Sequence, residues 1–282
     1  MAEALLAHFT RYLYLIPGGY FIVVFIKRII GKTYLNPTWR TFSFRGIKFK
    51  TDLSKQMGKD IFWRGAHDWA PVFTLEKILK GGQTFIDIGA NQGEYTLWAL
   101  KKVRTTGKVI AYEPADKLYN QLNENVNLNP QFKDAFFSRK IGLSDVPGRI
   151  KLYTKPGINE GVNSIYPSGD HDLYLGEIEL STLDIELNSL ELKSVDCIKI
   201  DVEGAELNVL KGAKNTIITH RPTIITEINK DSCKAAGYEA IEILTFLKNL
   251  DYKLFEIGLR GKLSPLQIEK ISEFSNIVAF PN

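Results

Sequence analysis

Short runs of consecutive apolar residues alternate along the chain with segments in which apolar residues recur every three or four positions. An unbroken apolar run is typical of a strand buried on both faces, and the longer period is typical of a helix. Strands that alternate with helices predict an α/β fold with a mostly parallel sheet. The expected strands are residues 85–88, 108–112, 136–141, 195–200, 222–228, 252–257 and 276–280, with an added strand at 149–153.

Helical patterns fill most of the intervals between these strands. The clearest follows Ala115, where Leu118, Leu122 and Val126 share one face. Other helices are expected from residue 95, from residue 207, over 238–250 and from a capping-box pattern at 264–267, and the first strand is preceded by a hairpin over 42–50 and by helices over 54–63 and 71–79.

The segment from Lys155 to Ile178 has little periodicity and is rich in Gly, Asn, Ser and Asp. We expect a long loop, and loops of this length in a compact domain are usually functional or mobile. It contains His171, a candidate general base because histidine titrates near neutrality. A single loop histidine is more often only exposed, so His171 is a reserve candidate.

Composition sets the first 50 residues apart from residues 51–282. They hold eight Lys or Arg and one acid, Glu3, whereas the rest holds 28 basic and 31 acidic residues. Residues 12–26 carry no charge, and this stretch is shorter than the roughly 20 residues that span a bilayer. We expect residues 1–40 to form an interfacial helix pair on an anionic membrane surface. The alternative is a hairpin packed on the domain or on a second subunit, as in a homo-oligomer.

Charge and cysteine content exclude two classes of protein. Residues 51–282 are close to neutral, which argues against nucleic acid as a partner. Cys197 and Cys233 are too few for a disulfide framework. We therefore expect a reduced, cytoplasmic setting, at the inner membrane surface if the first 40 residues bind lipid.

The strongest chemical signal is the glycine-containing turn at residues 87–93, which follows the first strand of the sheet. Glycine lets the backbone adopt positive φ and approach a ligand, and the next helix directs N–H groups at polar ligand atoms. Glu113 ends the second strand 20 positions after Gly93, where nucleotide-binding folds place an acid on the ribose hydroxyls. The turn lacks the glycine pattern that holds a pyrophosphate. A nucleoside with a cationic end and no phosphate, such as S-adenosylmethionine, suits it better.

These observations define a set of cofactor-binding candidates. The end of the third strand typically lies beside the adenine, which adds two residues to those of the turn and the ribose acid. The candidates are Asp87, Gly89, Ala90, Asn91, Gly93, Tyr95, Glu113, Leu143 and Asp145.

A second acidic motif occupies residues 200–206, at the end of the strand over 195–200. Open α/β sheets bind ligands at the carboxyl ends of their strands, so Asp201 and Glu203 are expected to face a ligand. The third acid of the motif has the simpler role of a helix cap. We assign no metal ligands. Asp201, Glu227 and Asn229 nevertheless form an oxygen-rich layout that leaves a Mg²⁺ site open.

The sequence resembles the FkbM-type methyltransferases over about residues 60–282. The resemblance is carried by residues 85–96, 112–114 and 200–206, with support from residues 142–145 and 181–184. It implies a class I methyltransferase, Rossmann-like fold with a seven-stranded, mostly parallel sheet and helices on both faces. The first 50 residues lie outside the resemblance, and we expect them to add an N-terminal helical extension. The resemblance also implies S-adenosylmethionine as cofactor and methyl transfer to oxygen, typically a hydroxyl of a sugar, glycolipid or secondary metabolite.

An alcohol is a poor nucleophile until its proton is removed, so this chemistry calls for a placed base. We assign the acceptor proton to Glu203 and acceptor positioning to Asp201, with His171 in reserve.

Other functions remain open. The chain could be a nucleotide-binding α/β module that docks a partner or a membrane without turnover, or a methyltransferase for a small secondary metabolite rather than a glycan, glycolipid or polysaccharide precursor. The turn pattern disfavours a dehydrogenase.

Overall fold

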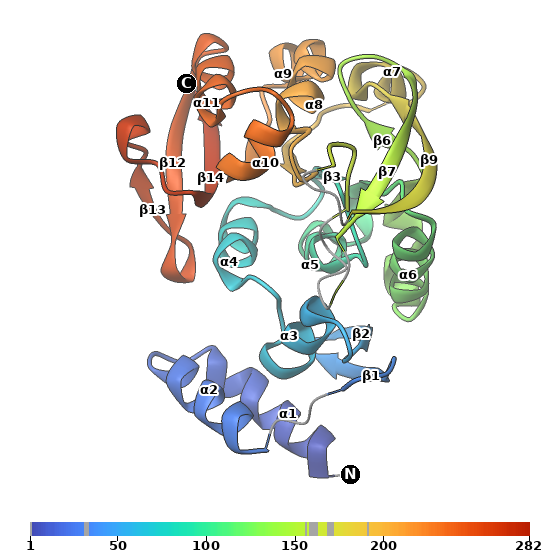
Figure 1. Cartoon of the computed structure of the whole chain (residues 1–282), viewed down its shortest axis with the longest axis vertical. Coiled ribbons are helices and arrows are strands. Elements are labelled where there is room, and N and C mark those ends of the chain that lie inside the picture. Colours follow the sequence, from blue (N-terminus) through green and yellow to red (C-terminus); the bar gives the residue numbers. More distant parts are fainter. Residues whose placement is uncertain (1, 31–33, 156, 158–162, 168–171, 191) are drawn as a thin grey trace. The chain divides into compact units, whose positions relative to one another are not determined.

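The computed structural model describes residues 2–30, 34–155, 157, 163–167, 172–190 and 192–282, which form two compact units (Figure 1). The first contains residues 1–68 and a short piece at Gly157, and the second contains the remainder. None of the helices formed by the described residues is both long and apolar enough to cross a membrane. The expected division after residue 50 stays a prediction, because compact units need not coincide with functional domains.

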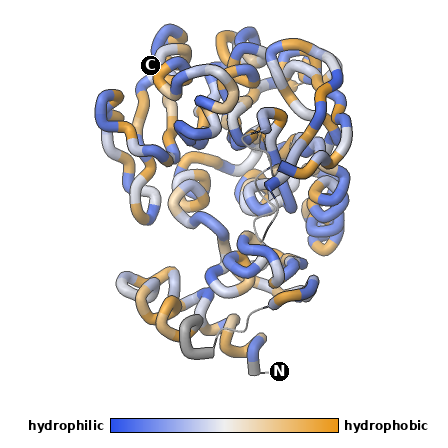
Figure 2. Tube along the Cα trace, viewed as in Figure 1, coloured by the Kyte–Doolittle hydropathy of each residue, from blue (hydrophilic) through white to orange (hydrophobic). Residues whose placement is uncertain are grey.

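The described residues of the first unit form three helices and a β-hairpin. α1 (Ala2–Tyr14) contacts α2 (Gly19–Ile30) and α3 (Gln56–Arg64), and the hairpin of β1 (Trp39–Phe44) and β2 (Ile47–Asp52) contributes to its core. Hydrophobic positions recur along both N-terminal helices in Figure 2. The structure confirms the helix pair and the hairpin that the sequence predicts.

Specific contacts fix α1 on α3. Ala7 is fully buried against Phe62 and Trp63. Thr10 Oγ1 donates to the carbonyl of Trp63 at 2.8 Å, and Arg11 donates to the carbonyl of Phe62 at 2.6 Å. Residues of α1 therefore form part of the core of this unit.

The second unit is built on an eight-stranded sheet with the order β13-β12-β14-β11-β10-β3-β4-β5. The five strands from β11 to β5 are parallel, and β14 is antiparallel to both of its neighbours. This confirms the predicted class I methyltransferase fold. The strands are β3 (Thr84–Ile88), β4 (Lys108–Tyr112), β5 (Phe136–Arg139), β10 (Cys197–Ile200), β11 (Thr223–Asn229), β12 (Tyr252–Gly258), β13 (Lys262–Pro265) and β14 (Phe274–Pro281).

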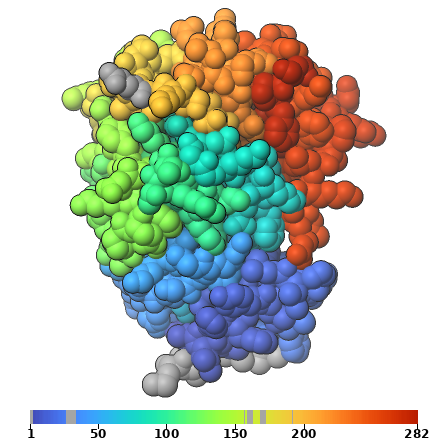
Figure 3. Space-filling view, turned by 180° about the vertical axis from the view of Figure 1, so that it is seen from behind, coloured from blue at the N-terminus to red at the C-terminus, as the bar shows by residue number. Residues whose placement is uncertain are grey.

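Helices cover both faces of this sheet. Ile86 and Ile198 belong to the same buried cluster as Leu210 of α8 and Leu244 of α11. On the other face α5 contacts β3 and β4, and α4 contacts α5; both lie at the surface in Figure 3, in cyan and teal. The helices are α4 (Trp69–Ile78), α5 (Glu94–Val103), α6 (Asp116–Asn127), α7 (Leu183–Asn188), α8 (Glu206–Gly212), α9 (Lys214–His220), α10 (Lys230–Ala235) and α11 (Ala240–Asn249).

A second, four-stranded sheet has the order β6-β9-β7-β8. It contains β6 (Gly142–Leu143), β7 (Gly148–Thr154), β8 (Asn163–Ser164) and β9 (Leu173–Ser181). The prediction of an unbroken loop over 155–178 is therefore wrong for its described part. β9 pairs antiparallel with β7, and this long-range pairing gives order to a segment whose own sequence shows little periodicity.

The prediction of a helix that begins at the capping-box pattern of residues 264–267 is also wrong. Residues 262–265 form β13, which pairs antiparallel with β12 at the edge of the main sheet. Pro265 is tolerated there because an edge strand does not need every N–H for its ladder. Backbone pairing with β12 outweighs the local helix-start pattern.

Candidate functional site

The turn after β3 passes very close to the segment that follows β10. Gly89, Asn91 and Gly93 have φ values of +76°, +51° and +92°, in the left-handed region. A Cβ atom placed on Gly89 would lie 1.9 Å from the carbonyl oxygen of Asp201. Only glycine satisfies both constraints at this position, since it has no Cβ and adopts positive φ freely.

The end of β4 joins the same turn. The Gly89 and Ala90 N–H groups both donate to the carbonyl of Tyr112 at 3.0 Å. Glu113 is buried, and its carboxylate accepts hydrogen bonds from the N–H groups of Asn91 at 2.8 Å and Ala115 at 2.9 Å. Burial raises the pKa of Glu113 to about 7, although these two hydrogen bonds oppose the rise. The structure thus brings the ribose candidate and the glycine turn together.

Asp87 is the one acid of the glycine-containing turn at residues 87–93, and its side chain is fully buried. Its Oδ2 accepts from Thr96 Oγ1 at 2.6 Å, whereas its Oδ1 has no hydrogen-bond partner among the described residues. Burial raises the pKa of Asp87 above its ordinary value. An unsatisfied buried oxygen is costly and therefore indicates a missing donor, as a cationic ligand group would provide.

The remaining cofactor candidates lie in different surroundings. Tyr95, at the start of α5, is half-buried, and its ring centroid lies 4.4 Å from Lys199 Nζ. Leu143 is packed in the hydrophobic core, and Asp145 is exposed and accepts a hydrogen bond from Ser144. These surroundings do not test a cofactor role for Leu143 or Asp145, so their assignment stays a prediction.

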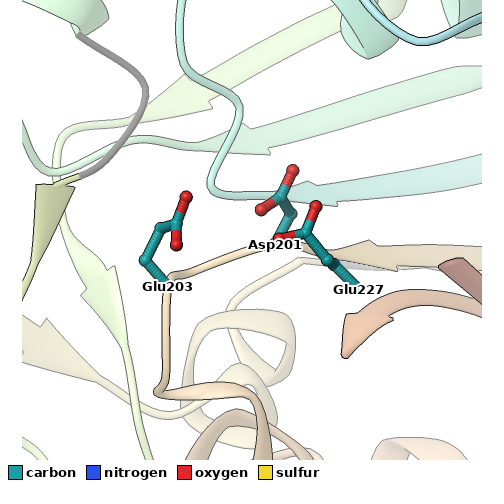
Figure 4. Close-up of side chains that lie close together, drawn as sticks. All are labelled: Asp201, Glu203 and Glu227. Atoms are coloured by element: carbon teal, nitrogen blue, oxygen red, sulfur yellow. The ribbon is translucent and has the colours of Figure 1, made fainter. Parts of the chain in front are cut away.

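Three carboxylates converge at the ends of two neighbouring strands (Figure 4). Asp201, Glu203 and Glu227 each place one oxygen within 4.8 Å of the others. The register of β10 and β11 pairs Ile200 with Thr226, so the next residues, Asp201 and Glu227, lie side by side. Glu203 reaches the same point from the turn that leads into α8.

The backbone of that turn is fixed from two sides. Glu203 has a φ of +51°, which is strained for a residue with a side chain. Its carbonyl accepts a hydrogen bond from Ser164 Oγ of β8 at 2.6 Å. The Glu206 carboxylate accepts from the N–H groups of Val202 and Gly204, each at 3.0 Å. Glu206 therefore stabilises the turn before α8, close to the capping role that the sequence suggests.

Burial and the crowding of like charges raise the pKa values of Glu203 and Glu227. Burial, followed by the charges of Asp201 and Glu206, raises the pKa of Glu203 to about 8. Burial, followed by the charges of Asp201 and Glu203, also raises the pKa of Glu227 above its ordinary value. A carboxyl group with a pKa near neutrality can both take and release a proton at physiological pH, as general base catalysis requires.

Other predicted residues lie elsewhere. The side chain of Asn229 accepts a hydrogen bond from the Ser232 N–H at 3.3 Å and so caps α10. Glu203 joins the predicted pair of Asp201 and Glu227. His171 lies outside the described residues.

Lys199 is the site residue that the sequence interpretation missed. It lies in β10 and is 5% exposed, and its Nζ is 2.9 Å from Asp201 Oδ2. The available signal was a charged residue inside an otherwise apolar strand, which is rare unless the charge is paired.

Comparison with known proteins gives consistent matches. The model of the methyltransferase FkbM domain matches residues 87–254. The methyltransferase sdnD of Sordaria araneosa is 29% identical over 162 residues, covering 48% of this chain and 61% of sdnD. The hexuronic acid methyltransferase AglP of Haloferax volcanii is 28% identical over 131 residues, covering 46% of this chain and 50% of AglP. The chain thus spans between half and two thirds of the length of these relatives.

A solved structure described as methyltransferase FkbM from Methylobacillus flagellatus aligns over 94% of this chain and 71% of its own chain. Its sequence identity is 14%, and its TM-score is 0.46.

Proposed function

Because the chain belongs to the FkbM methyltransferase domain family, we propose that it transfers a methyl group from S-adenosylmethionine to a hydroxyl of a sugar, glycolipid or polysaccharide precursor. Membership confirms the family and the cofactor that the sequence predicts. The observation that carries the proposed reaction is the convergence of Asp201, Glu203 and Glu227 at the carboxyl ends of β10 and β11. Ligands of open α/β sheets bind at this edge.

The residues of the glycine turn suit this cofactor. Glu113 offers a buried carboxylate for the ribose hydroxyls, and the unpartnered Oδ1 of Asp87 offers an acceptor for a cationic group. The turn itself allows close approach of a ligand to the backbone at Gly89 and Gly93. When bound, S-adenosylmethionine supplies an electrophilic methyl group on a sulfonium.

The protein must then orient the acceptor and remove its proton. We assign the proton to Glu203, because it reaches the cluster from the turn before α8 and because burial raises its pKa to about 8, within reach of physiological pH. Asp201 accepts a hydrogen bond from the acceptor and orients it, since its carboxylate is already held by Lys199 at 2.9 Å. Methyl transfer needs a linear approach, so orientation contributes to the rate in addition to proton removal.

A hydroxyl-rich acceptor is supported by the chemistry of the cluster. Carboxylate oxygens accept hydrogen bonds from neighbouring hydroxyls, which sugars present in pairs. The relative named as a hexuronic acid methyltransferase supports the same acceptor class. A small secondary metabolite remains the second candidate.

The test is a screen of hydroxyl compounds, including hexuronic acids, for release of S-adenosylhomocysteine. Glu203→Gln keeps the shape and removes basicity, so turnover should fall by ~10²–10⁴ while cofactor affinity stays near wild type. The exposed Glu177→Gln is the matched control. Cofactor binding by wild-type protein without turnover of any compound in the screen would favour a binding module. Near-normal turnover in Glu203→Gln, with loss in His171→Ala, assigns the base to His171.

We also propose that α1 and α2 dock on an anionic membrane surface. Phe21 and Phe25 of α2 are 75% and 63% exposed, and Leu5 and Phe9 of α1 are 75% and 59% exposed. α2 is about 18 Å long, less than the roughly 30 Å hydrocarbon core, which suits a helix lying along the surface. The excess of basic residues in this part of the chain complements anionic lipid headgroups.

Liposome sedimentation tests this surface in the full chain. Substitution is cleaner than deletion, because Ala7, Thr10 and Arg11 are part of the core of the first unit. Phe21→Ser/Phe25→Ser should reduce binding to vesicles with phosphatidylserine, and high salt should act similarly. Leu259→Ser, which removes an exposed apolar residue of the second unit, is the control. If binding is absent and the double variant instead changes the oligomeric state, the partner is a second copy of the chain.

A further inference from the structure

Lys199 is a buried cation whose charge has a consequence beyond holding the Asp201 carboxylate. It lies opposite Asp87 in the β10–β3 ladder, and two residues before Asp201 on the same face of β10. Its Nζ is 2.9 Å from Asp201 Oδ2 and 4.4 Å from the centroid of the Tyr95 ring. The ammonium therefore lies between the cofactor turn and the acidic cluster.

The surroundings keep this ammonium charged. Burial lowers the pKa of Lys199, but the charges of Asp201, Asp87 and Glu227 and the hydrogen bond to Asp201 together raise it above its ordinary value. A buried ammonium is costly unless opposite charges and hydrogen bonds compensate it. The ion pair with Asp201 and the face of the Tyr95 ring provide that compensation.

The same geometry affects what the cluster can bind. Asp201, Glu203 and Glu227 have oxygens close enough to hold a divalent cation. A cation there would share Asp201 with the Lys199 ammonium and would meet its positive charge at short range. Lys199 already compensates part of the negative charge that would attract a metal.

We propose that Lys199 is a positioning residue that serves as the permanent internal cation of the acceptor site, in place of a divalent metal ion. It holds the Asp201 carboxylate in one orientation toward the acceptor and prevents metal binding by like-charge repulsion. The acceptor role rests on the proposed function, whereas the charge balance can be measured without turnover.

The first experiment uses wild-type protein and titrates it with MgCl₂ and MnCl₂ in a calorimeter. We expect no saturable binding up to about 1 mM, the weak end of protein sites for hard cations. Tighter Mn²⁺ binding that disappears in Asp201→Asn would overturn the proposal. This result does not depend on whether any Lys199 variant folds, or on whether an acceptor has been found.

The second experiment removes the ammonium. Lys199→Met should gain Mn²⁺ affinity by at least about tenfold, because three carboxylates then lack their internal counter-charge. Adding Asp201→Asn should remove the gain, and Lys199→Arg should keep metal affinity as low as in wild type. A folded Lys199→Met protein with unchanged metal affinity would show that Lys199 does not exclude metal. A purely structural lysine would not produce this pattern.

A third measurement connects the charge balance to the reaction. Once an acceptor is known, wild-type turnover should be the same in EDTA and in MgCl₂. Loss of turnover in EDTA would contradict the role of Lys199. Absence of turnover under all conditions would instead contradict the proposed function and leave the metal titrations valid.

Discussion

In the first unit, Phe21 and Leu5 each expose 75% of their surface, whereas in the second unit Asp87 is fully buried and Lys199 is 5% exposed. Apolar side chains are outside in one region, and charged side chains are inside in the other. Both arrangements cost free energy in the isolated chain unless something compensates them. On our docking proposal, the exposed helices would gain free energy by covering their apolar side chains with a membrane surface. The buried charges gain by pairing with one another and with a ligand.

This difference predicts how substitutions should act. In the acidic site, one atom added or one charge removed affects many close contacts, and effects on stability or binding should be large. On α1 and α2, the exposed side chains contact little within the protein, so substitutions should change partner binding and leave stability nearly unchanged.

The largest effect is expected for Gly89→Ala. The new Cβ would lie 1.9 Å from the Asp201 carbonyl oxygen at a φ of +76°, so two strand ends must separate. We expect a loss of about 3 kcal/mol or more in the free energy of unfolding, together with loss of cofactor binding. Guanidinium unfolding and titration with S-adenosylhomocysteine measure both. Gly148→Ala is the control, because nothing lies within 4 Å of its Cβ position. Stability equal to that control would contradict the close approach.

Glu113→Ala should weaken S-adenosylhomocysteine binding by roughly 1.5–3 kcal/mol, because the ribose hydroxyls lose a charged acceptor. The exposed Asp134→Ala provides the comparison. Calorimetric titration decides, and an affinity equal to wild type would remove Glu113 from the cofactor site.

The pH dependence of stability tests the half-buried acid Glu203 directly. Its pKa is about 8 in the folded protein, and the ordinary value is 4.5. Between these values the folded state holds a proton that the unfolded state has released, so this group makes stability fall as pH rises. Relative to wild type, Glu203→Gln should therefore become more stable by about 1.4 kcal/mol between pH 6 and pH 7. Guanidinium unfolding at a series of pH values gives the difference. A constant difference across this range would mean that Glu203 is already ionised at pH 6.

The smallest effect is expected on the exposed helix. Phe21→Ser/Phe25→Ser should change the free energy of unfolding by no more than about 0.5 kcal/mol, as is usual for exposed positions. Val23→Ser, midway between these two positions in the sequence and fully buried, should cost several times more. Equal losses would mean that the apolar face of α2 already has a partner within the protein.

The local pattern of the sequence was sufficient for the elements that are strongly periodic. Short segments rich in apolar residues, placed between helical patterns, identified seven strands of the main sheet, and alternation around Arg45-Gly46 identified the β1–β2 hairpin. Local rules failed at β13 and β9, where pairing with a distant strand decides the conformation. The capping-box pattern at residue 264 is a local signal, and it carries no information about whether β12 has a free edge with which this segment can pair.

The candidate site shows the same limit. The sequence by itself placed Asp87, Glu113, Asp201 and Glu203 at or just beyond the carboxyl ends of parallel strands, because strand ends and acidic residues are both visible in it. Only the tertiary structure decided that Asp201 and Glu227 are neighbours, that Asn229 caps α10, and that Lys199 lies beneath the cluster. These facts depend on the register between β10 and β11 and on the pleat of β10. Register is a relation between strands far apart in the chain, and neither strand encodes it alone.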